Sequence, residues 1–329
     1  MAKPSPSFRL LVAAALSLAA GLAAAADAVT VGYQTGIDPT KIPQADGVYE
    51  KATGSRINWR KFDSGADLIA ALASGDVAIG NIGSSPLAAA ASRGLPIETF
   101  LVADEIGSAE ALVARNGSGI ATPRDLAGKK VAVPFVSTTH YSLLAALRHW
   151  GVDPAKVTIL NLRPGEIAAA WQRGDIDAAY VWDPALGKIK TGGKVLTSSA
   201  EVAKWGAPTY DIWVVRKDFA AAHPAFVARF AKVSLDAIAG YRADPRAFAA
   251  NPGNIAKISR LTGAAAPDVV AGLNGNRFLN RDEQAALLQS PFAAAVGRTA
   301  AFLKAQGKVE SLQPDYGPFV TSRFVKTAR

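Results

Sequence analysis

The chain has 329 residues, with 36 Lys and Arg against 27 Asp and Glu, a formal net charge of +9, three His and no Cys. The lack of cysteine excludes disulfide scaffolds, zinc fingers, iron–sulfur centres and cysteine nucleophiles, because each of these needs a thiolate. A charged fraction of 19% beside 50% hydrophobic residues is typical of a folded chain, and its length predicts two domains.

Residues 1–28 are predicted to be a secretory signal peptide. A positively charged start precedes the apolar run from Leu10 to Ala26, and the small residues at its end fit cleavage after Ala26 or Ala28. A membrane anchor is the alternative, but the run is shorter than the ~20 strongly apolar residues that span a bilayer. Because an exported chain without cysteine cannot carry a lipid, we expect the protein in the periplasm of a Gram-negative cell.

The following segment is predicted to alternate between strands and helices. Strand periodicity covers Val29–Gln34, Ile57–Phe62, Val77–Ile82 and Ile97–Val102, with helices over Ala66–Ala73 and Pro86–Ser92. After a polar stretch the pattern restarts, with strands over Lys130–Pro134, Val157–Leu162 and Ala178–Trp182 and helices over Thr138–Trp150 and Ile167–Arg173. Because strands separated by helices leave room for crossovers, the pattern predicts parallel pairing in two α/β units.

The last third of the chain is predicted to be helical, for example over Asp218–Tyr241 and Asp282–Gln306. One strand, Ile212–Lys217, stands before it and could return to the first sheet. Two separate domains in series are the alternative, but we favour two lobes with crossing connections. Since open α/β sheets bind ligands beyond the carboxyl ends of their strands, two such edges would face each other across a cleft.

Hydroxyl side chains follow a predicted strand in each unit. Ser84 and Ser85 stand before Pro86, and Thr138 and Thr139 open the second helix after Ser137. Free backbone N–H groups and the helix dipole make such helix starts suited to anions, above all to tetrahedral oxyanions. Ordinary N-capping explains each motif taken singly. Two motifs at matching positions of two α/β units favour a ligand.

A cationic group would need acidic or aromatic neighbours. Strand ends and the segment before Ile212 offer five candidates, namely Tyr33, Trp182, Trp205, Tyr210 and Asp211. Aromatic rings attract ammonium groups, and one carboxylate supplies a full counter-charge. For the rings, ordinary core packing is the stronger interpretation. Asp211 stands in an apolar run, where an unpaired carboxylate would be costly.

Other classes of function have little support. Basic residues are scattered rather than gathered in stripes, which argues against nucleic-acid binding. No hydrolase elbow, metalloprotease, phosphate-loop or dinucleotide motif occurs. His140 near Ser137 could imitate a nucleophile and base, but a helix cap is the simpler interpretation. We therefore expect no enzyme, no cofactor and no metal.

Several long strings resemble one protein family. They are WRKFDSGAD (59–67), IGNIGSSPLA (79–88), VAVPFVSTTHYSLLAAL (131–147), AAWQRGDIDAAYVW (169–182) and WGAPTYDIWVVRKDF (205–219), together with ALASGDV. The chain resembles the solute-binding proteins of bacterial ABC importers for aliphatic sulfonates, nitrate and taurine, and within them the taurine branch. The resemblance implies a type II periplasmic-binding fold, with two α/β lobes joined by two hinge strands. The lobes would comprise 29–113 with 213–329, and 114–212.

The resemblance also implies roles for individual residues. Ser84, Ser85, Thr138 and Thr139 would contact a sulfonate, and Asp211 would pair with an ammonium group. Gln34 and Trp182 would complete the walls of the cleft. Asp183 departs from the taurine branch, which has a small residue there, and it would either alter the preference for amines or act as a cap.

The resemblance predicts a monomeric periplasmic receptor that captures taurine and delivers it to an inner-membrane permease. A receptor for alkanesulfonates without an amine is the first alternative. An enzyme of the same fold acting on a thiamine precursor is the second, and it would need His140 in the cleft.

Overall fold

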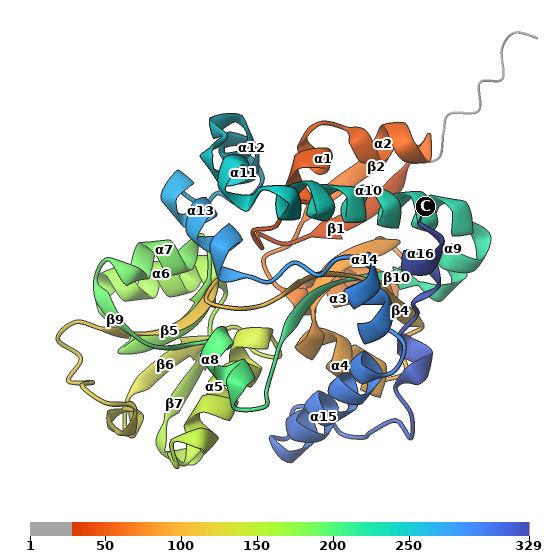
Figure 1. The fold of residues 1–329 in the computed structure, drawn as a ribbon. Coiled ribbons are helices and arrows are strands. Elements are labelled where there is room, and N and C mark those ends of the chain that lie inside the picture. The colour runs from red at the N-terminus through yellow and green to blue at the C-terminus, as the bar shows by residue number, and fades with distance from the viewer. Residues whose placement is uncertain (1–27, 329) are drawn as a thin grey trace, which may run out of the picture.

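The computed structural model describes residues 28–328, which form two five-stranded sheets with helices around them (Figure 1). We call each sheet with its surrounding helices a lobe, the first containing the N-terminal strand. The predicted two-lobed α/β fold is confirmed. The signal-peptide prediction concerns residues that, apart from Ala28, lie outside this range. Within the range no helix is both long and apolar enough for a membrane span.

The first sheet has the strand order β2-β1-β3-β10-β4. Its strands are β1 (Val29–Tyr33), β2 (Ile57–Lys61), β3 (Ile79–Gly83), β4 (Ile97–Glu105) and β10 (Tyr210–Arg216). Every residue of β3 is buried, as expected for a strand covered on both faces. Strand β10 runs antiparallel between β3 and β4, so the predicted return to the first sheet is confirmed. The predicted parallel pairing is confirmed for β1 with β2 and with β3, whereas β4 is separated from these strands by β10.

The second sheet has the order β7-β6-β8-β5-β9. Its strands are β5 (Glu110–Arg115), β6 (Lys130–Val133), β7 (Thr158–Asn161), β8 (Ala178–Trp182) and β9 (Gly193–Ser198). Sequence analysis missed β5 and β9, which pair antiparallel with each other beside β8. The second sheet has a hydrophobic core on each of its two faces, because successive side chains of a strand point to opposite faces. Leu112 packs into one of these cores and its neighbour Val113 into the other.

Helices cover the faces of both sheets. Those of the first lobe are α1 (Lys41–Ala45), α2 (Val48–Thr53), α3 (Gly65–Ser74), α4 (Ser84–Ser92), α9 (Lys217–Ala222), α10 (Pro224–Ala243), α11 (Pro245–Ala250), α12 (Pro252–Thr262), α13 (Ala266–Gly275), α14 (Arg281–Leu287), α15 (Pro291–Ala305) and α16 (Arg323–Thr327). Those of the second are α5 (Thr138–His149), α6 (Pro164–Arg173), α7 (Ala185–Lys190) and α8 (Ser199–Lys204). The two long helices predicted near the C-terminus are each divided, at Pro224 and at Pro291, because proline starts a helix and lacks the N–H that would continue one.

The chain passes between the sheets twice, after β4 and again between β9 and β10. The lobe limits predicted at 113/114 and 212/213 fall inside β5 and β10, and they stay predictions. The first crossing packs closely on the segment after α13. A Cβ atom added to Gly107 would lie 1.9 Å from the carbonyl oxygen of Gly275, and the Ser108 N–H donates to that oxygen at 2.8 Å.

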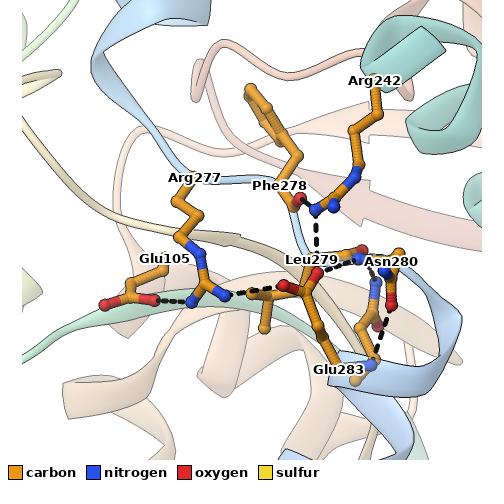
Figure 2. A network of polar contacts seen from close by, with 8 residues as sticks. Glu105, Arg242, Arg277, Phe278, Leu279, Asn280 and Glu283 are labelled. Atoms are coloured by element: carbon orange, nitrogen blue, oxygen red, sulfur yellow. Dashed lines mark hydrogen bonds and ion pairs between the residues drawn. The ribbon is translucent and has the colours of Figure 1, made fainter.

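A network of charges fixes this segment to the first lobe (Figure 2). Arg277 forms ion pairs of 2.8 Å with Glu105 at the end of β4 and with Glu283 in α14. Glu283 also pairs with Arg242 of α10 at 2.8 Å and accepts the Asn280 N–H at 2.7 Å as part of a capping box. The first crossing is therefore held by several helices of the first lobe.

Candidate functional site

One cavity lies between the two sheets and takes its lining from both lobes. Its polar lining residues are Gln34, Thr35, Glu110, Ser137, Thr138, Trp182, Asp183, Asp211 and Asn276. Its other lining residues are Gly36, Ile37, Gly65, Gly83, Pro86, Ile106 and Ala109. The cavity adjoins strand ends and helix starts, where open α/β sheets bind their ligands.

Four of the seven residues predicted for the site line this cavity, namely Gln34, Thr138, Trp182 and Asp211. The other three, Ser84, Ser85 and Thr139, are buried and do not contribute to the lining. The Ser84 hydroxyl accepts the Tyr210 N–H at 3.2 Å, and the Thr139 hydroxyl bonds to that of Ser137 at 2.7 Å. Ser85 is fully buried, and its hydroxyl has no hydrogen-bond partner among residues 28–328.

The starts of α4 and α5 meet at the cavity from opposite lobes. A Cβ atom added to Gly83, the N-cap residue of α4, would lie 2.6 Å from Cγ2 of Thr138, the first residue of α5. Only glycine therefore allows this approach without displacing Thr138. Each helix start has N–H groups without intrahelical partners, so the junction places two positive dipole ends side by side.

Acidic side chains gather at the first-lobe wall. Asp211, on β10, lines the cavity and stands opposite Asp104 on the neighbouring strand β4. Asp104 is almost fully buried, and its Oδ1 has no hydrogen-bond partner in the described part of the chain. Burial, together with the charge of Asp38, raises the pKa of Asp211 to about 6. Burial and the charge of Asp211 likewise raise the pKa of Asp104 well above its usual value.

Lys41, the cation whose charge acts on both of these acids, is already paired. Lys41 forms an ion pair of 2.7 Å with Asp38, and both side chains are almost completely buried. Asp38 also accepts the Thr40 N–H at 2.7 Å. A buried carboxylate with a matched cation and further donors is stable, whereas one without them is costly. Asp104 and Asp211 therefore lack a full counter-charge of their own.

Glu110 is a site residue that sequence analysis missed. It begins β5, lines the cavity and is 5% exposed. Its two carboxyl oxygens accept hydrogen bonds from the hydroxyls of Thr138 at 2.5 Å and Ser199 at 2.9 Å. Burial raises the pKa of Glu110 to about 8, against the lowering effect of the Thr138 hydrogen bond. The available signal was a glutamate directly before an apolar strand-like run, ALVA.

Trp182 and Asp183 join the lobes across the cavity. The Trp182 indole N–H donates to the Thr35 hydroxyl at 3.2 Å, and that hydroxyl donates to the Asp183 carbonyl oxygen at 2.8 Å. Asp183 lines the cavity, and its carboxyl accepts the Gly187 N–H at 2.8 Å. Burial raises the pKa of Asp183 to about 6. Of the two roles considered for Asp183, the bond to Gly187 fits a cap, and its place in the cavity lining fits an effect on the preference for amines.

The remaining candidates His140 and Trp205 lie outside the lining. The His140 ring stacks on Phe135 at 4.7 Å, its Nδ1 accepts the Val136 N–H, and burial lowers its pKa to about 4. Ser137 caps the helix by accepting the His140 N–H at 3.1 Å, so the capping interpretation of this pair is confirmed. Trp205 stacks on the ring of His149, the last residue of α5. No group of three His, Asp or Glu side chains among residues 28–328 is arranged to hold a metal ion.

Comparisons with known proteins give a consistent result. The NMT1/THI5-like family matches residues 57–248. The taurine-binding periplasmic protein of Escherichia coli K12 is 53% identical over 97% of this chain and 99% of its own length. A putative aliphatic sulfonates-binding protein of Bacillus subtilis 168 is 29% identical over 62% of each chain. The periplasmic aliphatic sulphonate binding protein SsuA of Escherichia coli has the same fold, with a TM-score of 0.69 at 24% identity over 90% of this chain and 91% of that one.

Proposed function

The chain belongs to the NMT1/THI5-like family, and from this premise we propose that it is the periplasmic solute-binding component of an ABC importer and that its ligand is taurine. The relative with 53% identity over nearly the whole chain is named as a taurine-binding periplasmic protein, which supports both the ligand and the compartment. A monomer that delivers taurine to an inner-membrane permease follows as part of the proposal.

The observation that carries the proposal is that groups suited to an anion and groups suited to a cation line one cavity between the lobes. Two helix starts meet there at Gly83 and Thr138, and carboxyl groups of both lobes line the same space. Taurine is a small zwitterion with a sulfonate and an ammonium group. Helix N-termini suit the sulfonate, and carboxylates suit the ammonium group.

We assign the sulfonate to the junction of α4 and α5. The hydroxyl of Ser85, which is buried and has no partner among the described residues, would serve as a donor as the lobes adjust to the ligand, and so would the N–H groups at Thr138 and Thr139. Asp211 would pair with the ammonium group. Gln34 and Trp182 would enclose the ligand from the two sides.

The acids at the cavity also weigh against the alternatives. A receptor for alkanesulfonates without an amine would gain nothing from Asp211 and would face the cost of its buried charge. An enzyme relying on His140 would need that ring at the cavity, but it is stacked on Phe135 outside the lining. The receptor for taurine is therefore the function that the site supports best.

A thermal-shift panel tests the proposal on the purified chain without residues 1–28. The panel compares taurine, hypotaurine, ethanesulfonate, sulfate and nitrate at equal concentration. Taurine should raise the melting temperature most, since a ligand that binds only the native state stabilises it. An equal rise with ethanesulfonate would support the alkanesulfonate alternative instead, and no rise with any sulfonate would reject both.

A further inference from the structure

We propose that Glu110 is a second carboxylate for the ligand's ammonium group, and that this ammonium, held between Glu110 and Asp211, joins the two lobes. The inference rests on the proposed function and adds to it a residue that fixes both the choice of ligand and the closure of the lobes.

The two carboxyl groups come from different lobes and line the same cavity. Glu110 lies on β5 in the second sheet, where it stands opposite Trp182 of β8. Asp211 lies on β10 in the first sheet, where it stands opposite Gly83 of β3. They are close enough for the charge of Asp211 to contribute to the raised pKa of Glu110. A ligand that contacts both therefore contacts both lobes.

Within the described part of the chain, neither carboxyl group has a cation of its own. Among residues 28–328, Glu110 takes part in no ion pair, and its two hydrogen-bond donors are neutral hydroxyls. The Ser199 hydroxyl is held in turn, since it bonds to the hydroxyl of Tyr180 at 3.1 Å. Lys41, the cation whose charge acts on Asp211, is already bound to Asp38. The cavity thus has two carboxyl groups whose charged forms a cationic ligand would stabilise.

The bonding capacity of Glu110 fits an ammonium group. A carboxylate has about four acceptor positions, and each oxygen of Glu110 uses one for a hydroxyl. Each oxygen can therefore accept one further N–H. An ammonium group has three N–H donors, enough to reach Glu110, Asp211 and one more acceptor. Thr138 and Ser199 would position the Glu110 carboxyl rather than compete for it.

A consequence follows for ligands that have no amine. Without an ammonium group, Glu110 and Asp211 would approach each other on closure with no cation between them. The closed form would then be disfavoured, either by repulsion between two charged carboxylates or by the cost of burying unpaired carboxyl groups. We therefore expect an alkanesulfonate to bind weakly and to leave the lobes apart. Selectivity would then arise at the closure step as well as at the first contact.

The first test measures the affinity of Glu110→Gln for taurine and for ethanesulfonate by calorimetry. The substitution keeps the size of the side chain and removes its charge. We expect taurine affinity to fall at least ~10-fold, as for one side of a desolvated charge pair, and ethanesulfonate affinity to stay equal or to rise. The matched control is Glu310→Gln, since Glu310 is exposed and is not among the residues that line the cavity.

Three results would separate this inference from the proposed function. Unchanged taurine affinity in Glu110→Gln, with normal binding by the original chain, overturns the inference alone. An equal loss for both ligands also overturns it, because it indicates a general loss of structure. Failure of the original chain to bind taurine at all overturns the proposed function.

A second test needs no variant, and so remains decisive if Glu110→Gln does not fold. Small-angle X-ray scattering of the original chain gives its radius of gyration with no ligand, with saturating taurine and with saturating ethanesulfonate. We expect the smallest radius with taurine only. The same radius with saturating ethanesulfonate would overturn the inference.

Discussion

The indole N–H of Trp182 donates to the hydroxyl of Thr35 at 3.2 Å, and this bond connects the second lobe to the first. The same hydroxyl donates to the Asp183 carbonyl oxygen at 2.8 Å, so Thr35 contacts two consecutive residues of the opposite lobe. Both bonds lie at the lining of the cavity. A single hydroxyl therefore links enclosure of the ligand to contact between the lobes.

Replacing Thr35 with Val should weaken the closed form. The substitution keeps the shape of the side chain but removes both bonds, each worth about 0.5–1.5 kcal/mol. We expect taurine to dissociate several-fold faster, with little change in the association rate. Stopped-flow tryptophan fluorescence measures both rates. Arg163→Ala is the control, because it removes the exposed inter-lobe ion pair with Asp67, and such pairs contribute little.

Replacing Asp211 with Asn should separate binding from stability. Loss of one partner of a desolvated charge pair costs about 2–5 kcal/mol of affinity for taurine. The ligand-free chain should be no less stable near pH 8, since the substitution removes a charge that burial disfavours. Calorimetry and urea unfolding give the two quantities. Equal affinity in the variant would remove Asp211 from the proposed site.

Stability and affinity should depend on pH in opposite directions. Asp211 and Glu110 have folded-state pKa values near 6 and 8, above their usual 3.8 and 4.5. Their favourable contribution to folding is complete below about pH 4 and is lost as the pH rises through 6 to 8. Asp38, Lys41 and Asp104 are the other charged groups that act on this pair.

Taurine should counteract this loss. An ammonium group beside the carboxyls favours their charged forms, so binding releases protons and affinity rises between about pH 5 and 8. Calorimetry in two buffers of different ionisation enthalpy counts the protons released. Asp211→Asn should release fewer of them. A proton count of zero at pH 6 in the original chain would contradict the expected shift.

Replacing Gly107 with Ala should disturb the first crossing between the lobes. The added Cβ would lie 1.9 Å from the Gly275 carbonyl oxygen, a backbone atom that cannot move aside cheaply. We expect a loss of about 1–3 kcal/mol in the free energy of unfolding, as for other overpacked sites. Gly240→Ala is the matched control, since Gly240 lies in α10 with open space around it. There Ala should stabilise the helix by up to about 1 kcal/mol.

Much of the architecture could be predicted from apolar periodicity. Short apolar segments between predicted helices indicated the buried strand β3 and its neighbours. A segment of the same kind indicated β10, through which the chain returns to the first sheet. The strands β5 and β9 were missed for different reasons. The first begins with Glu110, a residue type that usually indicates the surface, and the second has exposed positions and weak alternation at the sheet edge.

The site was only partly accessible from the sequence for a related reason. Motifs at helix starts led to Thr138, and an acid in an apolar run led to Asp211, because local sequence carries both signals. Glu110 and Thr35 reach the cavity through strand pairing and lobe contact, which link residues far apart in the chain. The burial of Lys41 could not be predicted from the sequence either, since a lysine three residues after an aspartate is typical of an exposed ion pair.

The position of β10 between β3 and β4 has a consequence for synthesis. A ribosome makes β3 and β4 well before β10. The strand edges of β3 and β4 that pair with β10 therefore stay unpaired while the whole second sheet is synthesised. The second sheet, whose strands are contiguous in the chain, can assemble first and shorten the distance that β10 must search. If the chain is truncated just before Tyr210 and treated with a protease, the segment that forms the second sheet should therefore resist digestion. The rest of the truncated chain should be degraded.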